Sequence, residues 1–77
     1  MRRAGDVVRT AQGVAVVRCP DGEYPDPGTT LVDEHLADVG RVVDVFGPVE
    51  RPYLAVSPAE GVTLAPLVGH PVYARDD

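Results

Sequence analysis

The sequence predicts an all-β protein, a small six-stranded closed β-barrel, on three observations. Fifteen of the 77 residues are valine, none is isoleucine or tryptophan and one is phenylalanine, and small β-branched side chains suit a pleated sheet better than a helix. Short valine-rich runs alternate with turn residues at roughly the 8–12-residue spacing of small barrels, whose closure leaves no exposed sheet edge. Because so short a chain supports only one hydrophobic core, we expect residues 1–77 to form a single domain.

The first two strands are expected to form a hairpin. Residues 5–10 (GDVVRT) and 13–18 (GVAVVR) are β-rich runs separated by Ala11 and Gln12, which is the spacing of a tight turn. Residues 19–30 (CPDGEYPDPGTT) contain three prolines and two glycines, a density that excludes a helix or a central strand. They are predicted to form a loop within the domain.

The middle of the chain carries the two clearest strands, residues 41–46 and 53–57. Before them, residues 30–32 predict a short strand, and residues 33–40 (DEHLADVG) predict a turn with room for at most one helical turn. The remaining expected elements are a turn at 58–61, a short extended run at 62–64 and a closing strand at 71–74.

The charge balance argues against direct nucleic-acid binding. Twelve acidic residues face seven basic ones, all of them arginine, for a net charge of −5. Non-specific binding of RNA or DNA depends on Lys and Arg side chains that neutralise phosphates, so we expect any contact with nucleic acid to be indirect. A lysine-free acidic surface over a valine-rich core also indicates adaptation to high intracellular salt, which screens the repulsion between like charges.

Residues that could carry chemistry are few. Cys19 is the only cysteine, so neither an intramolecular disulfide nor a cysteine-based metal site is expected. His35 and His70 stand outside any HxxxH or HExxH pattern, and no glycine-rich segment has the lysine and following helix of a phosphate loop. We therefore predict no catalytic residues, no metal and no cofactor. Without a signal peptide or an apolar span, the chain is predicted to be cytoplasmic, with no membrane partner.

Residues 40–56 (GRVVDVFGPVERPYLAV) carry two aromatic side chains where two strands meet a connection with two prolines. Successive side chains of a strand point to opposite faces. If Val43 and Val45 face the core, Phe46 therefore faces outwards.

The same alternation applies to the second strand, where inward-facing Leu54 and Val56 turn Tyr53 outwards. Two outward aromatics at one connection predict a binding surface for a partner, because exposed apolar patches mark such contacts. The alternative is that Phe46 caps the mouth of the barrel. A register slip of one residue would exchange the two faces.

The run VGRVVDVFGPVERPYLAVSP closely resembles the signature of the Gar family, the glycine/arginine-rich protein family. Its members are small core subunits of the H/ACA ribonucleoproteins that guide RNA pseudouridylation. The similarity extends from the opening GDVVRTAQGVAVVR through TLVDEHLADVG to the closing VGHPVYA, and the pattern matches archaeal members. Its most specific part is DVFGPVxxPY.

This resemblance implies a barrel of the kind also seen in translation factors and reductases, without catalytic activity of its own. It implies docking on the catalytic domain of the pseudouridine synthase subunit. There the family's member controls a mobile loop that grips substrate RNA, and so promotes substrate loading and product release in rRNA pseudouridylation. Guide RNA and substrate rRNA would be contacted only indirectly.

Carried over position by position, the resemblance places the partner-binding surface around one connection, with a flank further along the chain. Its members are Val45, Phe46, Gly47, Pro48, Val49, Pro52 and Tyr53, flanked by Val68, Gly69 and Tyr73. A second interpretation is a PRC-type barrel, which acts in ribosome maturation by binding a ribosomal protein. Such barrels share a small valine-rich core and a G-x-V-x-D strand like residues 40–44, but DVFGPVxxPY is not expected in them.

Overall fold

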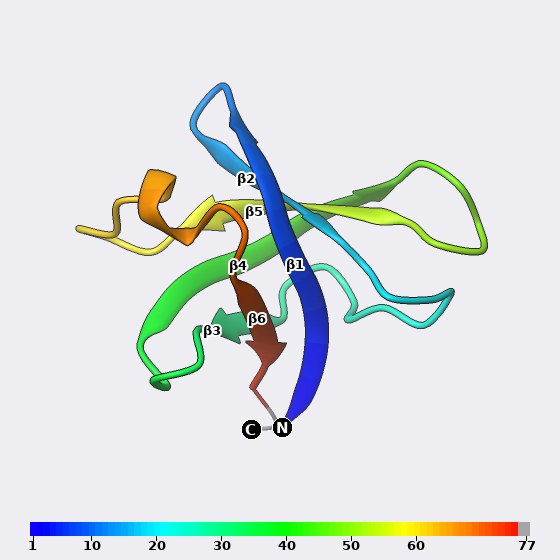
Figure 1. Ribbon diagram of the computed structural model, residues 1–77, viewed down its shortest axis with the longest axis horizontal. Helices are drawn as coiled ribbons and strands as arrows, with labels where there is room; N and C mark the ends of the chain where they lie inside the picture. Colours follow the sequence, from blue (N-terminus) through cyan, green and yellow to red (C-terminus); the bar gives the residue numbers. More distant parts are fainter. Residues whose placement is uncertain (76–77) are drawn as a thin grey trace.

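The computed structural model describes residues 1–75, which form a closed barrel of six antiparallel strands in the order β1-β2-β5-β4-β3-β6 (Figure 1). The predicted six-stranded all-β barrel is confirmed. Closure gives every strand two neighbours, so no backbone edge of the sheet is left open. The elements are β1 (Arg2–Ala11), β2 (Val14–Arg18), β3 (Thr30–Val32), β4 (Asp38–Phe46), β5 (Tyr53–Pro58), a 3₁₀ helix η1 (Ala65–Leu67) and β6 (Pro71–Ala74).

β1 and β2 form the predicted hairpin, but the turn lies one residue later than expected. β1 begins at Arg2, before the predicted run, and Ala11 pairs with Val14 across a two-residue turn. The turn residues Gln12 and Gly13 both have positive φ, 51° and 82°, as a type I′ hairpin turn requires. This turn follows the right-handed twist of the strands, which lets the long β1 continue across the barrel.

Two segments rich in turn residues connect the next strands. Residues 19–29, between β2 and β3, contain no helix or strand. Residues 33–37 form the turn before β4, in which the Leu36 N–H donates to the Asp33 carbonyl at 3.0 Å. No residue of this turn is helical, and β4 begins earlier than predicted.

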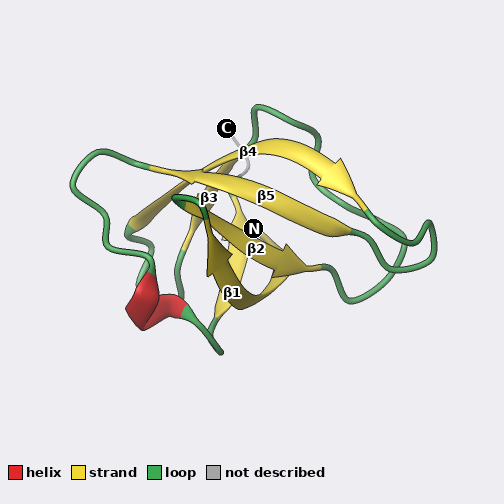
Figure 2. Ribbon diagram, turned by 90° about the horizontal axis from the view of Figure 1, so that it is seen from above, coloured by secondary structure: helices red, strands yellow, loops and turns green. Residues whose placement is uncertain are grey.

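The extended run predicted at residues 62–64 is wrong. These residues pair with no strand, and η1 follows them on the connection between β5 and β6, outside the barrel wall (Figure 2). The physical reason is closure, because β6 already pairs with both β1 and β3 and leaves no edge for a further strand. The segment instead buries Leu64 in the core.

Small aliphatic side chains fill the barrel interior, and among residues 1–75 no polar or charged side chain is buried. Leu54 and Val56 of β5 both point into this core, as alternation predicted. The largest fully buried side chains are those of Leu31, Leu54, Val7, Val17, Val32, Val39, Val42, Val56, Val72 and Cys19.

β4 departs from strict alternation at Val43. The register of β4 against β5 shifts between Val42 and Asp44, so Val43 is the extra residue of a β-bulge. Val42 is 1% exposed, whereas Val43 is 49% exposed. The prediction that Val43 faces the core is therefore wrong. Beyond the bulge the alternation resumes, shifted by one residue, and Val45 packs against the core.

Two matched substitutions test this register. Val42→Ala removes two methyl groups from the core and is expected to lower the free energy of unfolding by about 2 kcal/mol. Val43→Ala makes the same chemical change at the bulge and should lower it by no more than about 0.5 kcal/mol. Denaturant titrations followed by circular dichroism measure both values. Equal losses would contradict the bulge.

Candidate functional site

The candidate site is the β4–β5 junction, residues 46–53, at one end of the longest axis of the barrel (Figure 1, right). Phe46 ends β4, Tyr53 begins β5, and the two residues form a cross-strand pair. Their rings stack with centroids 5.6 Å apart and planes inclined by 20°. Phe46 is 39% exposed and Tyr53 is partly buried. The pair therefore presents aromatic surface on the outside of the barrel and does not cap its mouth.

Glycine and proline shape the connection between the two aromatics. Gly47 has a φ of 89°, and a β-carbon there would lie 2.8 Å from Tyr53 Cδ2, so a larger residue would displace the stacked ring. Pro48 and Val49 are exposed, Val49 to 87%. The Arg51 N–H closes the turn by donating to the Pro48 carbonyl at 3.2 Å. The junction thus combines a constrained backbone with a protruding aliphatic side chain.

The β2–β3 loop holds the junction from the side. The Cys19 N–H donates to the Pro52 carbonyl at 3.0 Å, and the Arg51 Nε–H donates to the Cys19 carbonyl at 2.9 Å. A β-carbon on Gly22 would lie 3.3 Å from the Val49 carbonyl oxygen, so the two loops touch there as well. We name this set of contacts the loop clasp. Sequence reasoning missed it, because its partners lie up to 33 positions apart and no local pattern marks them.

Outward side chains continue from the junction across three further strands. The Arg18 guanidinium carbon lies 5.2 Å from the centroid of the Tyr53 ring, within the range of a cation–π contact. Arg18 pairs across strands with Asp6, and Asp6 forms an ion pair with Arg3 that raises the pKa of the guanidinium. Arg3 in turn pairs with Tyr73 on β6. Tyr73 is thus linked to the junction along the barrel surface, three strands away from Tyr53.

The structure brings together most, but not all, of the residues predicted to bind a partner. Val45 packs against the core, and Pro52 is buried at the loop clasp. Val68 and Gly69 follow η1 on the opposite side of the molecule from the junction (Figures 1 and 2), where the Gly69 N–H donates to the Val7 carbonyl at 2.7 Å. Those at the junction are Phe46, Gly47, Pro48, Val49, Pro52 and Tyr53, with Val45 directly before it on β4.

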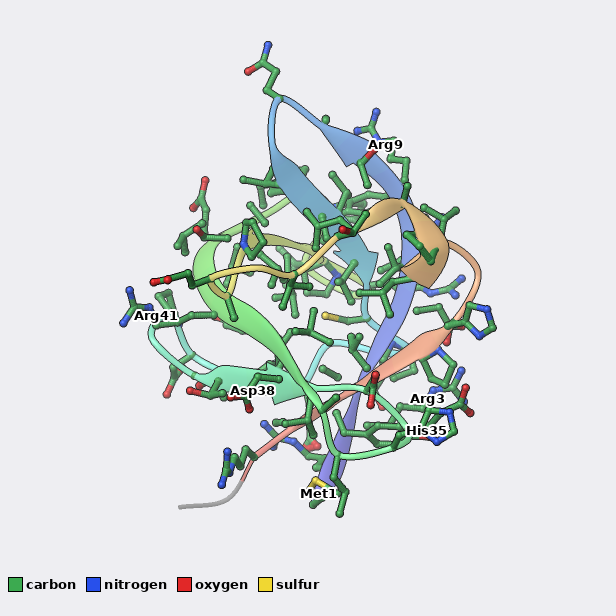
Figure 3. The ribbon with its side chains drawn as sticks, turned by 90° about the vertical axis from the view of Figure 1, so that its left-hand side faces the viewer. Met1, Arg3, Arg9, His35, Asp38 and Arg41 are labelled. Atoms are coloured by element: carbon green, nitrogen blue, oxygen red, sulfur yellow. The ribbon has the colours of Figure 1, made fainter. Side chains whose placement is uncertain are left out.

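The far end of the barrel carries charged side chains and both histidines. His35 and His70 line a shallow cavity of about 170 Å³ between the 33–37 turn and η1, and His70 Nδ1 lies 3.7 Å from Glu34 Oε1. Figure 3 views the molecule from this side, where the labelled His35, Asp38 and Arg41 point away from the barrel. Among residues 1–75, no group of three or more His, Cys, Asp or Glu side chains is placed to hold a metal ion.

Cys19 gives the loop clasp a measurable pH dependence. Burial, and secondly the charge of Asp21, raise the pKa of its thiol above the ordinary value of 9.0. In the unfolded chain the thiol loses its proton near that ordinary value, while the folded state still holds it. The unfolded state then binds fewer protons, so the free energy of unfolding falls as the pH rises above about 9.

We expect this loss to be smaller in Cys19→Ala than in the wild type, because the substituted chain lacks the titrating group. Urea titrations of both proteins between about pH 7 and pH 10 measure the difference in slope. As a second readout, an alkylating reagent should modify Cys19 in the native protein far more slowly than in the urea-unfolded chain, because the side chain is buried. Parallel pH profiles together with rapid native labelling would refute the buried thiol.

Comparison with known families identifies the chain. It matches the family model described as "Gar1/Naf1 RNA binding region" over residues 1–77, which includes the whole junction. A comparison with curated proteins gave no match. Within residues 1–75, no helix is long and apolar enough to cross a membrane. The family consists of non-catalytic proteins associated with the H/ACA ribonucleoprotein. This chain is a member of the Gar1/Naf1 family.

Proposed function

We propose that this protein docks through its β4–β5 junction on the catalytic domain of the pseudouridine synthase subunit of the H/ACA ribonucleoprotein, and acts there as a non-catalytic subunit. The observation that carries the proposal is the stacked Phe46–Tyr53 pair on the outside of the barrel. Val49 stands exposed on the same connection. Apolar side chains grouped on the surface of a small soluble domain mark a contact with a partner.

The junction is built to lose little entropy when it binds. Pro48 and Pro52 fix two backbone φ angles, and the loop clasp anchors the connection at Arg51. A surface already held in its bound shape keeps more of its contact energy as affinity. Aromatic side chains in such a position are the usual hot spots of an interface, where truncation to alanine costs 2 kcal/mol or more.

The proposal assigns RNA contact to the partner, with guide RNA and substrate rRNA reached only indirectly. The family description names RNA binding, but this chain carries a net charge of −5 and no lysine. Nucleic-acid surfaces need arginine and lysine free to neutralise phosphates. Four of the seven arginines already have partners within the chain: Arg3, Arg18, Arg51 and Arg75.

In this role the subunit promotes substrate loading and product release during rRNA pseudouridylation, by controlling a mobile loop of the synthase in the cytoplasm. The family match favours this role over that of a PRC-type barrel that binds a ribosomal protein, because the matched region includes the complete DVFGPVERPY motif. A pull-down at high salt separates the two. It should recover the synthase rather than ribosome-assembly factors.

A single substitution tests the docking surface. Phe46→Ala should weaken binding to the purified synthase by about 2 kcal/mol, roughly a 30-fold rise in Kd, because the aromatic contact is lost. The matched control is Leu36→Ala. Leu36 is 63% exposed and lies in the turn at the opposite end of β4, so its loss should change Kd by less than about twofold. Isothermal titration calorimetry measures the affinities, and circular dichroism checks that each barrel is folded.

Tyr53→Ala provides an independent variant at the same site. Unchanged affinity in both Phe46→Ala and Tyr53→Ala, with both proteins folded, would rule out docking through the junction. Equal weakening by Leu36→Ala would also do so, because it would show that the effect is not local.

The proposed role also predicts a kinetic signature. A complex assembled with Phe46→Ala should lose multiple-turnover pseudouridylation while its single-turnover rate changes less, since loading and release are slowed rather than the chemical step. Quench-flow experiments with substrate in excess and with enzyme in excess measure the two rates. An equal fall in both would point to a defect in chemistry or assembly and contradict the role in turnover.

A further inference from the structure

The loop clasp widens the junction into a face that includes the β2–β3 loop. A β-carbon on Gly22 would lie 3.3 Å from the carbonyl oxygen of Val49 and 3.6 Å from that of Glu50. The residues on either side of Gly22 are Asp21 and Glu23, and both are exposed. Two loops far apart in sequence therefore lie in contact, and each carries exposed carboxylates next to the residues that touch.

The exposed carboxylates beside the junction form a border, which we name the acidic rim. All of its members are exposed, and none makes an ion pair with any residue in the described part of the chain. The two nearby arginines make other contacts, since Arg18 at the end of β2 lies over Tyr53 and the Arg51 side chain donates to the Cys19 carbonyl. The members of the acidic rim are Asp21, Glu23, Asp44 and Glu50.

We propose that the acidic rim determines which surface the junction accepts: a protein surface of the synthase on which arginine or lysine side chains surround an apolar depression for Phe46 and Val49. This inference rests on the proposed docking function and adds the chemistry of the partner. Complementary charges at the border of an interface speed association and exclude partners of the wrong charge, while the apolar centre supplies most of the affinity.

Charge also excludes the other class of partner from this face. A nucleic acid would bring phosphates against four carboxylates that form no ion pair, and repulsion between like charges at such a border costs several kcal/mol. A basic protein surface instead offers ion pairs to rim carboxylates that form none within residues 1–75. The rim therefore selects a protein over an RNA.

An alternative explanation is that the rim carboxylates only solvate a chain that is acidic throughout. A matched pair of variants distinguishes this explanation from the proposed role in docking. Glu23→Gln/Glu50→Gln removes two charges from the rim. Glu34→Gln/Glu60→Gln removes two from the turns at the opposite ends of β4 and β5. Both variants make the same chemical change at different positions on the barrel.

The experiment follows association with the purified synthase by stopped-flow fluorescence, at the same pH for every variant. In about 0.15 M salt the rim variant should associate about threefold more slowly than the wild type, and in about 1 M salt the difference should vanish as the screening length falls from about 8 Å to about 3 Å. The distal variant should match the wild type at both concentrations.

Equal slowing by the two variants would overturn the proposal in favour of overall charge. No slowing by the rim variant, while Phe46→Ala still weakens binding, would overturn it and leave the docking function standing. Failure of the wild type to bind the synthase would contradict both the docking function and the role of the acidic rim. The last measurement tests binding of guide RNA to the protein alone. Direct binding that Phe46→Ala abolishes would show that this face binds RNA and would overturn the proposal.

Discussion

The outward position of Phe46 depends on the β-bulge at Val43. Val42 faces the core, so strict alternation from that point would also turn Asp44 and Phe46 inwards and leave Val45 in solvent. Burying an unpaired carboxylate costs several kcal/mol. The extra residue avoids this arrangement, because it exchanges the inward-facing and outward-facing positions over the last three residues of the strand. Those positions then supply one side chain to the core and two to the surface, and the second of these is the aromatic on which docking is proposed to rest.

Barrel order gives the same end of the molecule its stiffness. β2 lies beside β5 in the closed sheet, so the loop that leaves β2 passes next to the loop that enters β5. The loop clasp is the consequence, with Cys19 bonded to both Pro52 and Arg51. Each such hydrogen bond is worth about 1 kcal/mol net, which is enough to restrain a connection that Pro48 and Gly47 already limit. The junction is therefore held from its two strands and from its neighbour.

Sequence patterns predicted the barrel and the aromatic pair because both depend on short-range signals. Alternation on β5 placed Leu54 and Val56 in the core correctly, since that strand is regular. Alternation failed on β4, because either of the adjacent residues Val42 and Val43 suits the core and no local pattern shows that Val43 is the extra residue of a bulge. The loop clasp and the acidic rim join residues that only barrel order brings together. Val68 and Gly69 entered the predicted surface through the resemblance alone, and the fold puts them on the opposite side of the molecule.

The division between an apolar centre and a charged rim decides how docking responds to salt. At about 0.15 M salt the screening length is about 8 Å, so the rim would attract a basic partner before contact. At about 1 M salt it is about 3 Å, so the rim charges would act only within the complex. Apolar burial is not screened, and excluded salts strengthen it. In the salt-rich interior that the acidic composition predicts, the proposed docking would therefore draw its affinity from Phe46, Tyr53 and Val49. An aromatic pair on a restrained loop keeps its contact energy at any ionic strength, whereas the charged cavity at the far end of the barrel does not, and this favours the junction as the proposed docking surface.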